Sequence, residues 1–448
     1  MEEVKEVGGK GVGEKVFTIN NVGAPRVQVK PLESRLPVPP QPRFPEPPAP
    51  LPLPKVRAPQ LSAEAPLAEL DPLTLMLGNA LFRRSSGNPV FMIAVKPNNR
   101  RYEYIEFLKR ILREIYMVSA RSPLNVQHVA KRLTEYQLAL LRSGSSIYVL
   151  DIDSIADSEA GAASIGKLAS FLEDRLREAF GQGFGFLVFY TSREYVSRIK
   201  SIWQAEVSGR GALYASLPQP VIVSISEDDA AFQLVGLLYG TSTVDGATSI
   251  DTAAIAAEAR LSECLEAAAN DSVAARYVRH AVDDEEARAE EAFLHYALKS
   301  LVVEYLLEAG YRGSSIDTEV VVANTTVDVF IRRGWAGGVI VEVETLHGSL
   351  NPAARLNSVL KSRLSTGYET WIVLHPLTAS IYKPVIAPLM RDYGSYGSVR
   401  FMTLDSDTCT LMDLEKHYER IEKAAERLIG ERGGFHVFQT FHTSAGGL

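Results

Sequence analysis

Residues 325–345 read TTVDVFIRRGWAGGVIVEVET, two apolar runs that acids interrupt and a glycine-rich segment joins. Side chains alternate between the two faces of a strand, so Glu342 and Glu344 share one face of the second run. Asp328 interrupts the first run, and a hairpin through residues 332–338 would bring all three carboxylates together. A buried carboxylate without a partner is costly, so this pattern favours either a bound metal ion or a positive charge beside the acids.

Sites rich in carboxylates suit hard cations, and we expect Mg²⁺ or Mn²⁺ at these acids. Such ions promote phosphodiester hydrolysis by activating a water and stabilising the charged phosphate. The three acids therefore predict phosphoryl chemistry. The alternative is a sheet face that carries acids and no metal.

The elements expected around the acids follow the order helix, three strands, helix and strand. Their ranges are residues 285–309, 319–323, 326–332, 339–344, 352–364 and 370–375. This order, with an acid in one strand and two acids in the next, resembles the PD-(D/E)XK nuclease superfamily over residues 285–375. The resemblance implies a restriction-endonuclease-like α/β domain with a mixed sheet. It also implies that Asp328 and Glu342 are metal ligands.

Glu344 stands where the superfamily has its motif lysine, which orients or deprotonates the attacking water. The resemblance leaves Glu344 as a third metal ligand or as a group that positions the water. A candidate replacement is Lys361, which flanks the apolar face of the helix at residues 352–364. The alternative for Lys361 is a solvated cation, the usual state of a helix lysine.

The helix expected at residues 285–309 carries polar groups on its apolar stripe. Glu291 and His295 fall inside this stripe, and Lys299 continues the series at its edge. Superfamily members often bring an acid from this helix to the metal, so the resemblance makes Glu291 a candidate metal ligand. His295 is a candidate contact for phosphate or water, and Lys299 is a further candidate site residue. The alternative for His295 is a hydrogen bond at the helix end.

Four arginines near the acids suggest a local track for nucleic-acid phosphates, and they are Arg332, Arg333, Arg355 and Arg363. The formal net charge of −7 argues against a broadly basic surface that binds nucleic acid without sequence preference. Contact with nucleic acid, for which DNA is favoured, must therefore be local. The alternative is that these arginines are solvated.

The rest of the chain divides by composition. Residues 1–72 hold 15 of the 24 prolines and predict a disordered tail, either a tether or a ligand for an aromatic groove of a protein partner. Residues 73–250 predict a Rossmann-like α/β domain with a parallel sheet and unknown role. A helical connector at residues 251–284 precedes the nuclease-like domain at 285–410, and residues 411–448 form a C-terminal helix and tail.

In the first domain we expect strands that alternate with helices. Strands are expected at residues 90–95, 146–152, 185–190 and 220–225, and helices at 102–117, 126–141, 162–180, 193–203 and 228–238. Asp151 and Asp153 end one of these strands, where α/β domains bind ligands. A sensing role is one interpretation of these acids, and the start of a helix is the other.

Two cysteines, Cys264 and Cys409, provide neither a thiolate zinc site nor a disulfide framework, which fits a reducing interior. Every apolar run is shorter than the roughly 20 residues that span a bilayer, and the N-terminus lacks a signal-peptide pattern. We therefore expect a cytoplasmic protein without a membrane partner. A homodimer stays open.

Together these patterns predict a metal-dependent nuclease that hydrolyses phosphodiester bonds, with DNA as the favoured substrate. Two alternatives stay open. One is a catalytically inactive nuclease fold that binds nucleic acid or a protein partner. The other is a ligand-sensing first domain that controls the nuclease.

Overall fold

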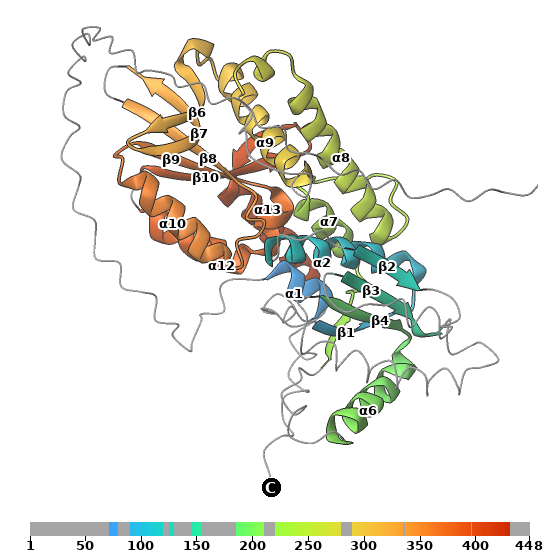
Figure 1. The fold of residues 1–448 in the computed structure, drawn as a ribbon. Helices are drawn as coiled ribbons and strands as arrows, with labels where there is room; N and C mark the ends of the chain where they lie inside the picture. The colour runs from blue at the N-terminus through green and yellow to red at the C-terminus, as the bar shows by residue number, and fades with distance from the viewer. Residues whose placement is uncertain are drawn as a thin grey trace, which may run out of the picture. The chain divides into compact units, whose positions relative to one another are not determined.

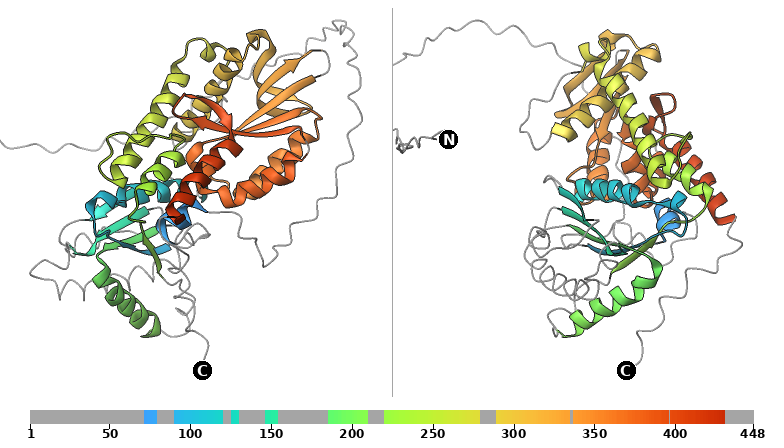
Figure 2. Two further views of the ribbon diagram at one scale, coloured as in Figure 1. Left: turned by 180° about the vertical axis from the view of Figure 1, so that it is seen from behind. Right: turned by 90° about the vertical axis from the view of Figure 1, so that its right-hand side faces the viewer.

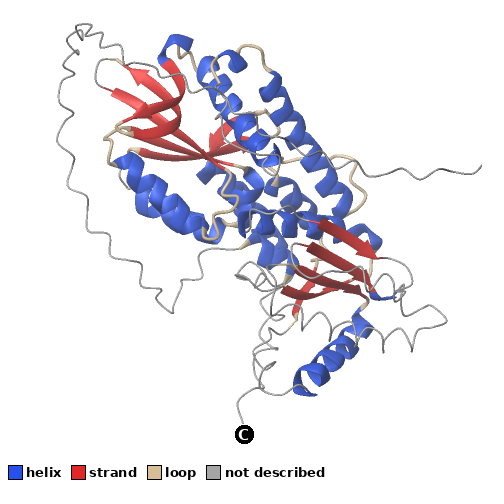
Figure 3. Ribbon diagram, in the orientation of Figure 1, coloured by secondary structure: helices blue, strands red, loops and turns tan. Residues whose placement is uncertain are grey.

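A computed structural model describes nine ranges of the chain, which together carry two β-sheets and their helices (Figures 1 and 3). These ranges are residues 71–78, 90–119, 125–129, 146–153, 185–209, 220–278, 289–334, 337–395 and 397–430. The tail expected at residues 1–72 lies outside them except for its last two residues, where α1 (Pro72–Leu77) begins. The helix expected at 162–180 and the tail after 430 also lie outside the described residues.

The first sheet has five parallel strands in the order β2-β3-β4-β1-β5. The strands are β1 (Val90–Val95), β2 (Asn125–Val129), β3 (Ser146–Asp151), β4 (Phe186–Thr191) and β5 (Val221–Ser224). The expected strands and their parallel arrangement are confirmed. The order differs from the two common doubly wound orders, in which the first strand neighbours the second or the third.

Strand β2 corrects the first four residues of the helix expected at residues 126–141, and the rest of that range lies outside the described residues. Val126 pairs in register with Ile147, and Val129 pairs with Leu150, so β2 extends the sheet beside β3. Valine is branched at Cβ and suits a strand, and pairing with a neighbouring strand overrides a helical pattern of apolar residues.

Helices of the first part lie close to their expected ranges. They are η2 (Arg100–Tyr102), α2 (Ile105–Ser119), α6 (Arg193–Gly209), α7 (Asp229–Leu238) and α8 (Ile250–Asn270). Helix α8 confirms the expected helical connector, and η3 (Ala274–Arg276) follows it. Within the described ranges, the helices are all too short or too polar to cross a membrane.

The second sheet is mixed, as predicted, with the order β11-β10-β9-β8-β7-β6. Its strands are β6 (Ile316–Val322), β7 (Thr325–Arg333), β8 (Gly337–Glu344), β9 (Glu369–Leu374), β10 (Val399–Asp405) and β11 (Thr410–Asp413). Strands β6 to β8 are antiparallel, β8 to β10 are parallel, and β11 is antiparallel to β10.

Several helices accompany this sheet: α9 (Ala289–Glu308), η5 (Gly313–Ser315), α10 (Pro352–Leu364), α11 (Pro376–Ile381), α12 (Lys383–Gly394) and α13 (Leu414–Gly430). Helix α10 makes the crossover between the parallel strands β8 and β9. Helix α8 packs along α9, and α13 packs against α7 (Figure 2). The described residues of both sheets belong to one compact unit.

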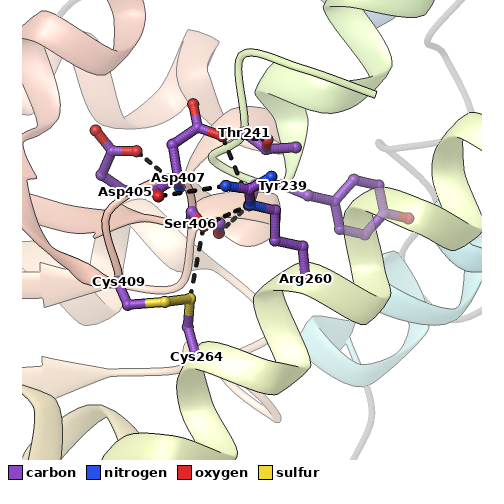
Figure 4. The surroundings of a disulfide bond; sticks show 8 residues. All are labelled: Tyr239, Thr241, Arg260, Cys264, Asp405, Ser406, Asp407 and Cys409. Atoms are coloured by element: carbon purple, nitrogen blue, oxygen red, sulfur yellow. Dashed lines mark hydrogen bonds and ion pairs between the residues drawn. A yellow bond between two sulfur atoms is a disulfide. The ribbon is translucent and has the colours of Figure 1, made fainter. Parts of the chain in front are cut away.

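A disulfide between Cys264 of α8 and Cys409 joins α8 to the turn between β10 and β11 (Figure 4). Beside it, Arg260 Nε donates a hydrogen bond to the Ser406 carbonyl at 3.0 Å. The bond corrects the expectation of a chain without disulfides. The two cysteines are 145 positions apart, so only the tertiary structure brings them together.

Candidate metal centre

Asp328 lies where strands β7 and β8 separate. The two strands pair in register as far as Val329 and Val341. Asp328 is the residue before Val329, on the side away from the hairpin. Its Oδ2 accepts a hydrogen bond from the Val343 backbone N–H at 2.8 Å. The carboxylate therefore lies in the gap between the strands, where it replaces a backbone carbonyl as the acceptor.

Helix α9 supplies two side chains to this gap, His295 and Lys299. They are four residues apart and so lie on one face of the helix. His295 Nε2 is 3.0 Å from Asp328 Oδ1, and Lys299 Nζ is 3.7 Å from the same oxygen. Lys299 is only 2% exposed, and its ammonium also donates to Glu319 on β6. A buried ammonium needs such acids, because an unpaired charge is costly away from water.

Glu319 is a member of the site that the sequence did not single out. Its neighbours Thr318 and Val320 pair with Val329 and Val327, which places Glu319 opposite Asp328. Its φ of +48° lies in the left-handed region, which costs a non-glycine residue roughly 1–3 kcal/mol and is often found at functional sites. The available signal was an acid at the start of an apolar strand next to the strand of Asp328.

Three potential ligand atoms, from His295, Glu319 and Asp328, lie within 4.8 Å of one another. Burial alone would raise the pKa of Asp328, but the hydrogen bond from His295 and the charges of His295 and Lys299 lower it. Asp328 is therefore ionised at neutral pH. Two carboxylates and one imidazole nitrogen fit a divalent cation such as Mn²⁺ or Mg²⁺.

Glu342 and Glu344 are instead capped by arginines of α10. Arg363 Nε is 2.6 Å from Glu342 Oε1. Arg355 donates from Nε and Nη2 to the two oxygens of Glu344 at 3.2 and 3.1 Å, a bidentate pair. The structure thus brings Glu342 and Glu344 to one face, as predicted, but pairs both with cations of the chain itself.

Helices α9 and α10 cover opposite faces of the mixed sheet. Tyr305 of α9 packs edge-on against Trp371 of β9, which is in register with Val341. Glu342, one residue farther along β8, points the other way and reaches Arg363 of α10. Asp328 in the strand gap therefore lies between the groups of α9 and the arginine-capped acids.

The buried position of these acids changes their titration. Burial, together with the negative charge of Asp328, raises the pKa of Glu342 to about 8, and Arg363 offsets only part of this rise. Burial also raises the pKa of Glu344, and Arg355 opposes it. Glu342 therefore exchanges a proton near neutral pH, where a nearby cation would favour its ionised form.

Replacing Glu342 by glutamine should flatten the pH dependence of stability. The pKa of Glu342 is raised from 4.5 to about 8, so the folded protein keeps a proton that the unfolded chain has lost. Stability therefore decreases as pH rises from about 4.5 to about 8. Urea unfolding of wild type and Glu342→Gln at pH 5 and pH 8 measures the change in the free energy of unfolding between the two pH values. An equal decrease in both proteins would show that Glu342 titrates normally.

Among the other predicted site residues, the two arginines of the β7–β8 hairpin make their contacts away from Asp328. Lys361 is exposed on α10. Arg332 pairs with Asp317, and Arg333 pairs with Glu369 at 2.6 Å, at the end of the β7–β8 hairpin that is remote from the strand gap. Glu291 belongs to α9, but its side chain lies outside the described part of the structure.

Comparison of the chain with protein-family models, with curated proteins and with solved structures gives no match. The chemistry of the site must therefore be inferred from its own residues.

Proposed function

We propose that this chain is a metal-dependent nuclease in which Asp328, Glu319 and His295 bind Mg²⁺ or Mn²⁺ beside Lys299. The convergence of these three ligand atoms within 4.8 Å supports the proposal most strongly. The mixed sheet and its flanking helices agree with the resemblance to the PD-(D/E)XK superfamily. The favoured reaction is hydrolysis of DNA phosphodiester bonds.

Lys299 is the residue suited to oppose the negative charge that develops on phosphate. Its ammonium is buried and close to Asp328, and a charge acts more strongly there than in water. When bound, a divalent cation supplies Lewis acidity toward a phosphate oxygen. Lys299 would hold the attacking water or a phosphate oxygen by a hydrogen bond. This is the role of the superfamily lysine, taken here by a residue of α9 instead of position 344 or Lys361.

A second candidate is a nuclease-like domain without catalysis, which binds nucleic acid or a protein. The arginine caps on Glu342 and Glu344 favour this candidate, because they neutralise two of the acids that the superfamily resemblance assigns to the metal or the attacking water. Cleavage measurements separate the two candidates.

Lys299→Met should lower the cleavage rate about 100- to 1000-fold, the scale expected when one positioned donor to a developing negative charge is lost. The assay uses labelled duplex, flap and single-stranded DNA with Mg²⁺, Mn²⁺ or EDTA. Lys361→Met is the matched control, because Lys361 is an exposed lysine of the same domain. Cleavage that needs Lys361 rather than Lys299 would overturn the assignment. No metal-dependent cleavage by wild type on any substrate would favour the non-catalytic candidate.

A further inference from the structure

The two arginines of α10 are built-in cations next to the candidate metal centre. Both glutamate side chains that they cap are only 7% exposed, so each acid has little access to solvent cations. The Arg355 side chain is 55% exposed, so it can leave Glu344 without passing through the core. Asp328 Oδ2 accepts the N–H of Val343 at 2.8 Å, and Val343 lies between the two glutamates in β8, which places both acids beside the metal centre.

A strained loop between β8 and α10 positions these arginines. Asn351 at its end caps α10, since its Oδ1 accepts the Ala354 N–H at 3.0 Å. Leu346 and Leu350 within the loop have φ values of +63° and +59°, in the left-handed region. A non-glycine residue keeps this conformation only when its surroundings enforce it. The loop therefore depends on an outside contact.

That contact comes from the C-terminal half of α2, in the part of the chain that carries the first sheet. The backbone N–H of Gly348 donates to Met117 O at 2.7 Å, and that of Leu350 donates to Val118 O at 3.1 Å. Buried Glu114 of α2 faces the same loop, with its Oε1 3.3 Å from His347 Nε2. It also accepts a hydrogen bond from Thr378 of α11. Helix α2 thus holds the loop at three points.

We propose that Arg355 and Arg363 form an internal inhibitor of the metal centre, and that α2 holds it in place through the loop at residues 345–351. This regulation rests on the proposed metal-binding function. With the arginines in place, Glu342 and Glu344 form ion pairs within the chain and not with a bound metal. When the loop is released, α10 withdraws its arginines, and a divalent cation at the centre takes their place as the positive charge that favours the ionised form of both acids. A movement of α2 would therefore control the site from the part of the chain that carries the first sheet.

Calorimetric titration of the full chain with Mn²⁺ tests this inhibitor. Arg355→Met should bind Mn²⁺ about tenfold more tightly than wild type, the scale of one charge-assisted hydrogen bond. Arg332→Met is the matched control, because Arg332 is similarly exposed, at 59% against 55% for Arg355, but pairs with Asp317 and not with Glu344. It should bind like wild type. Unchanged or weaker binding by Arg355→Met would overturn the inhibitor.

Glu114→Gln tests the role of α2 without altering α10. It removes the charge that faces His347 while it keeps an oxygen for Thr378, and it should tighten Mn²⁺ binding by a few-fold. Wild-type affinity in this folded variant would overturn control by α2. If wild type binds Mn²⁺ and neither variant binds it more tightly, the inhibitor fails and the metal centre stands. If wild type and both variants all fail to bind Mn²⁺, the proposed function itself fails.

Discussion

Asp328→Asn should lower metal-dependent cleavage at least about 100-fold, because a catalytic metal contributes several kcal/mol of transition-state stabilisation. Asp328 contacts both side chains that α9 brings to the centre and also the backbone of β8. Its Oδ1 faces His295 and Lys299, and its Oδ2 accepts the Val343 N–H. Asparagine keeps the size of the side chain and an oxygen for Val343, but it removes the charge that attracts a cation.

Asp317→Asn is the matched control for this experiment. Asp317 is also an acid of the mixed sheet, but it lies near the start of β6 and pairs with Arg332. Its replacement should leave the cleavage rate unchanged. Equal rates for wild type and Asp328→Asn, measured on the same substrate with saturating Mn²⁺, would contradict the catalytic role of Asp328.

Loss of the disulfide should lower the free energy of unfolding by about 5 kcal/mol. The bond closes a loop of 145 residues, and the unfolded chain without it gains the conformational entropy of that loop. Urea unfolding of wild type with and without dithiothreitol measures the loss. The Cys409→Ser variant should unfold at the lower midpoint in both conditions. If the unfolding curves of wild type with and without dithiothreitol coincide, the disulfide does not form in solution.

The sequence predicted the strands around Asp328 because their patterns are local. Alternation in β7 and β8 fixed the faces of the strands, and the glycine-rich hairpin between them fixed their pairing. The helical period likewise placed His295 and Lys299 on an inward face of α9, where the structure brings both to Asp328. These features depend on spacing along the chain, which a sequence displays directly.

The composition of the centre could not be predicted in the same way. Glu319 joins the centre because its backbone is in the left-handed region, and no residue pattern predicts that conformation. Arg355 and Arg363 were expected to face nucleic acid, and their pairing with Glu344 and Glu342 depends on how α10 lies across the sheet. The disulfide and the edge strand β2 also depend on contacts between distant segments. Tertiary packing decided each of these features.

Crystals of the full chain soaked in Mn²⁺ and measured at an X-ray energy where manganese scatters anomalously would test the metal centre most directly. We predict one anomalous peak at coordinating distance from Asp328, Glu319 and His295, with Lys299 moved away from Glu319. Crystals of Asp328→Asn should lack this peak. A wild-type map without a peak at these three residues, with Lys299 still bound to Glu319, would contradict the proposed centre.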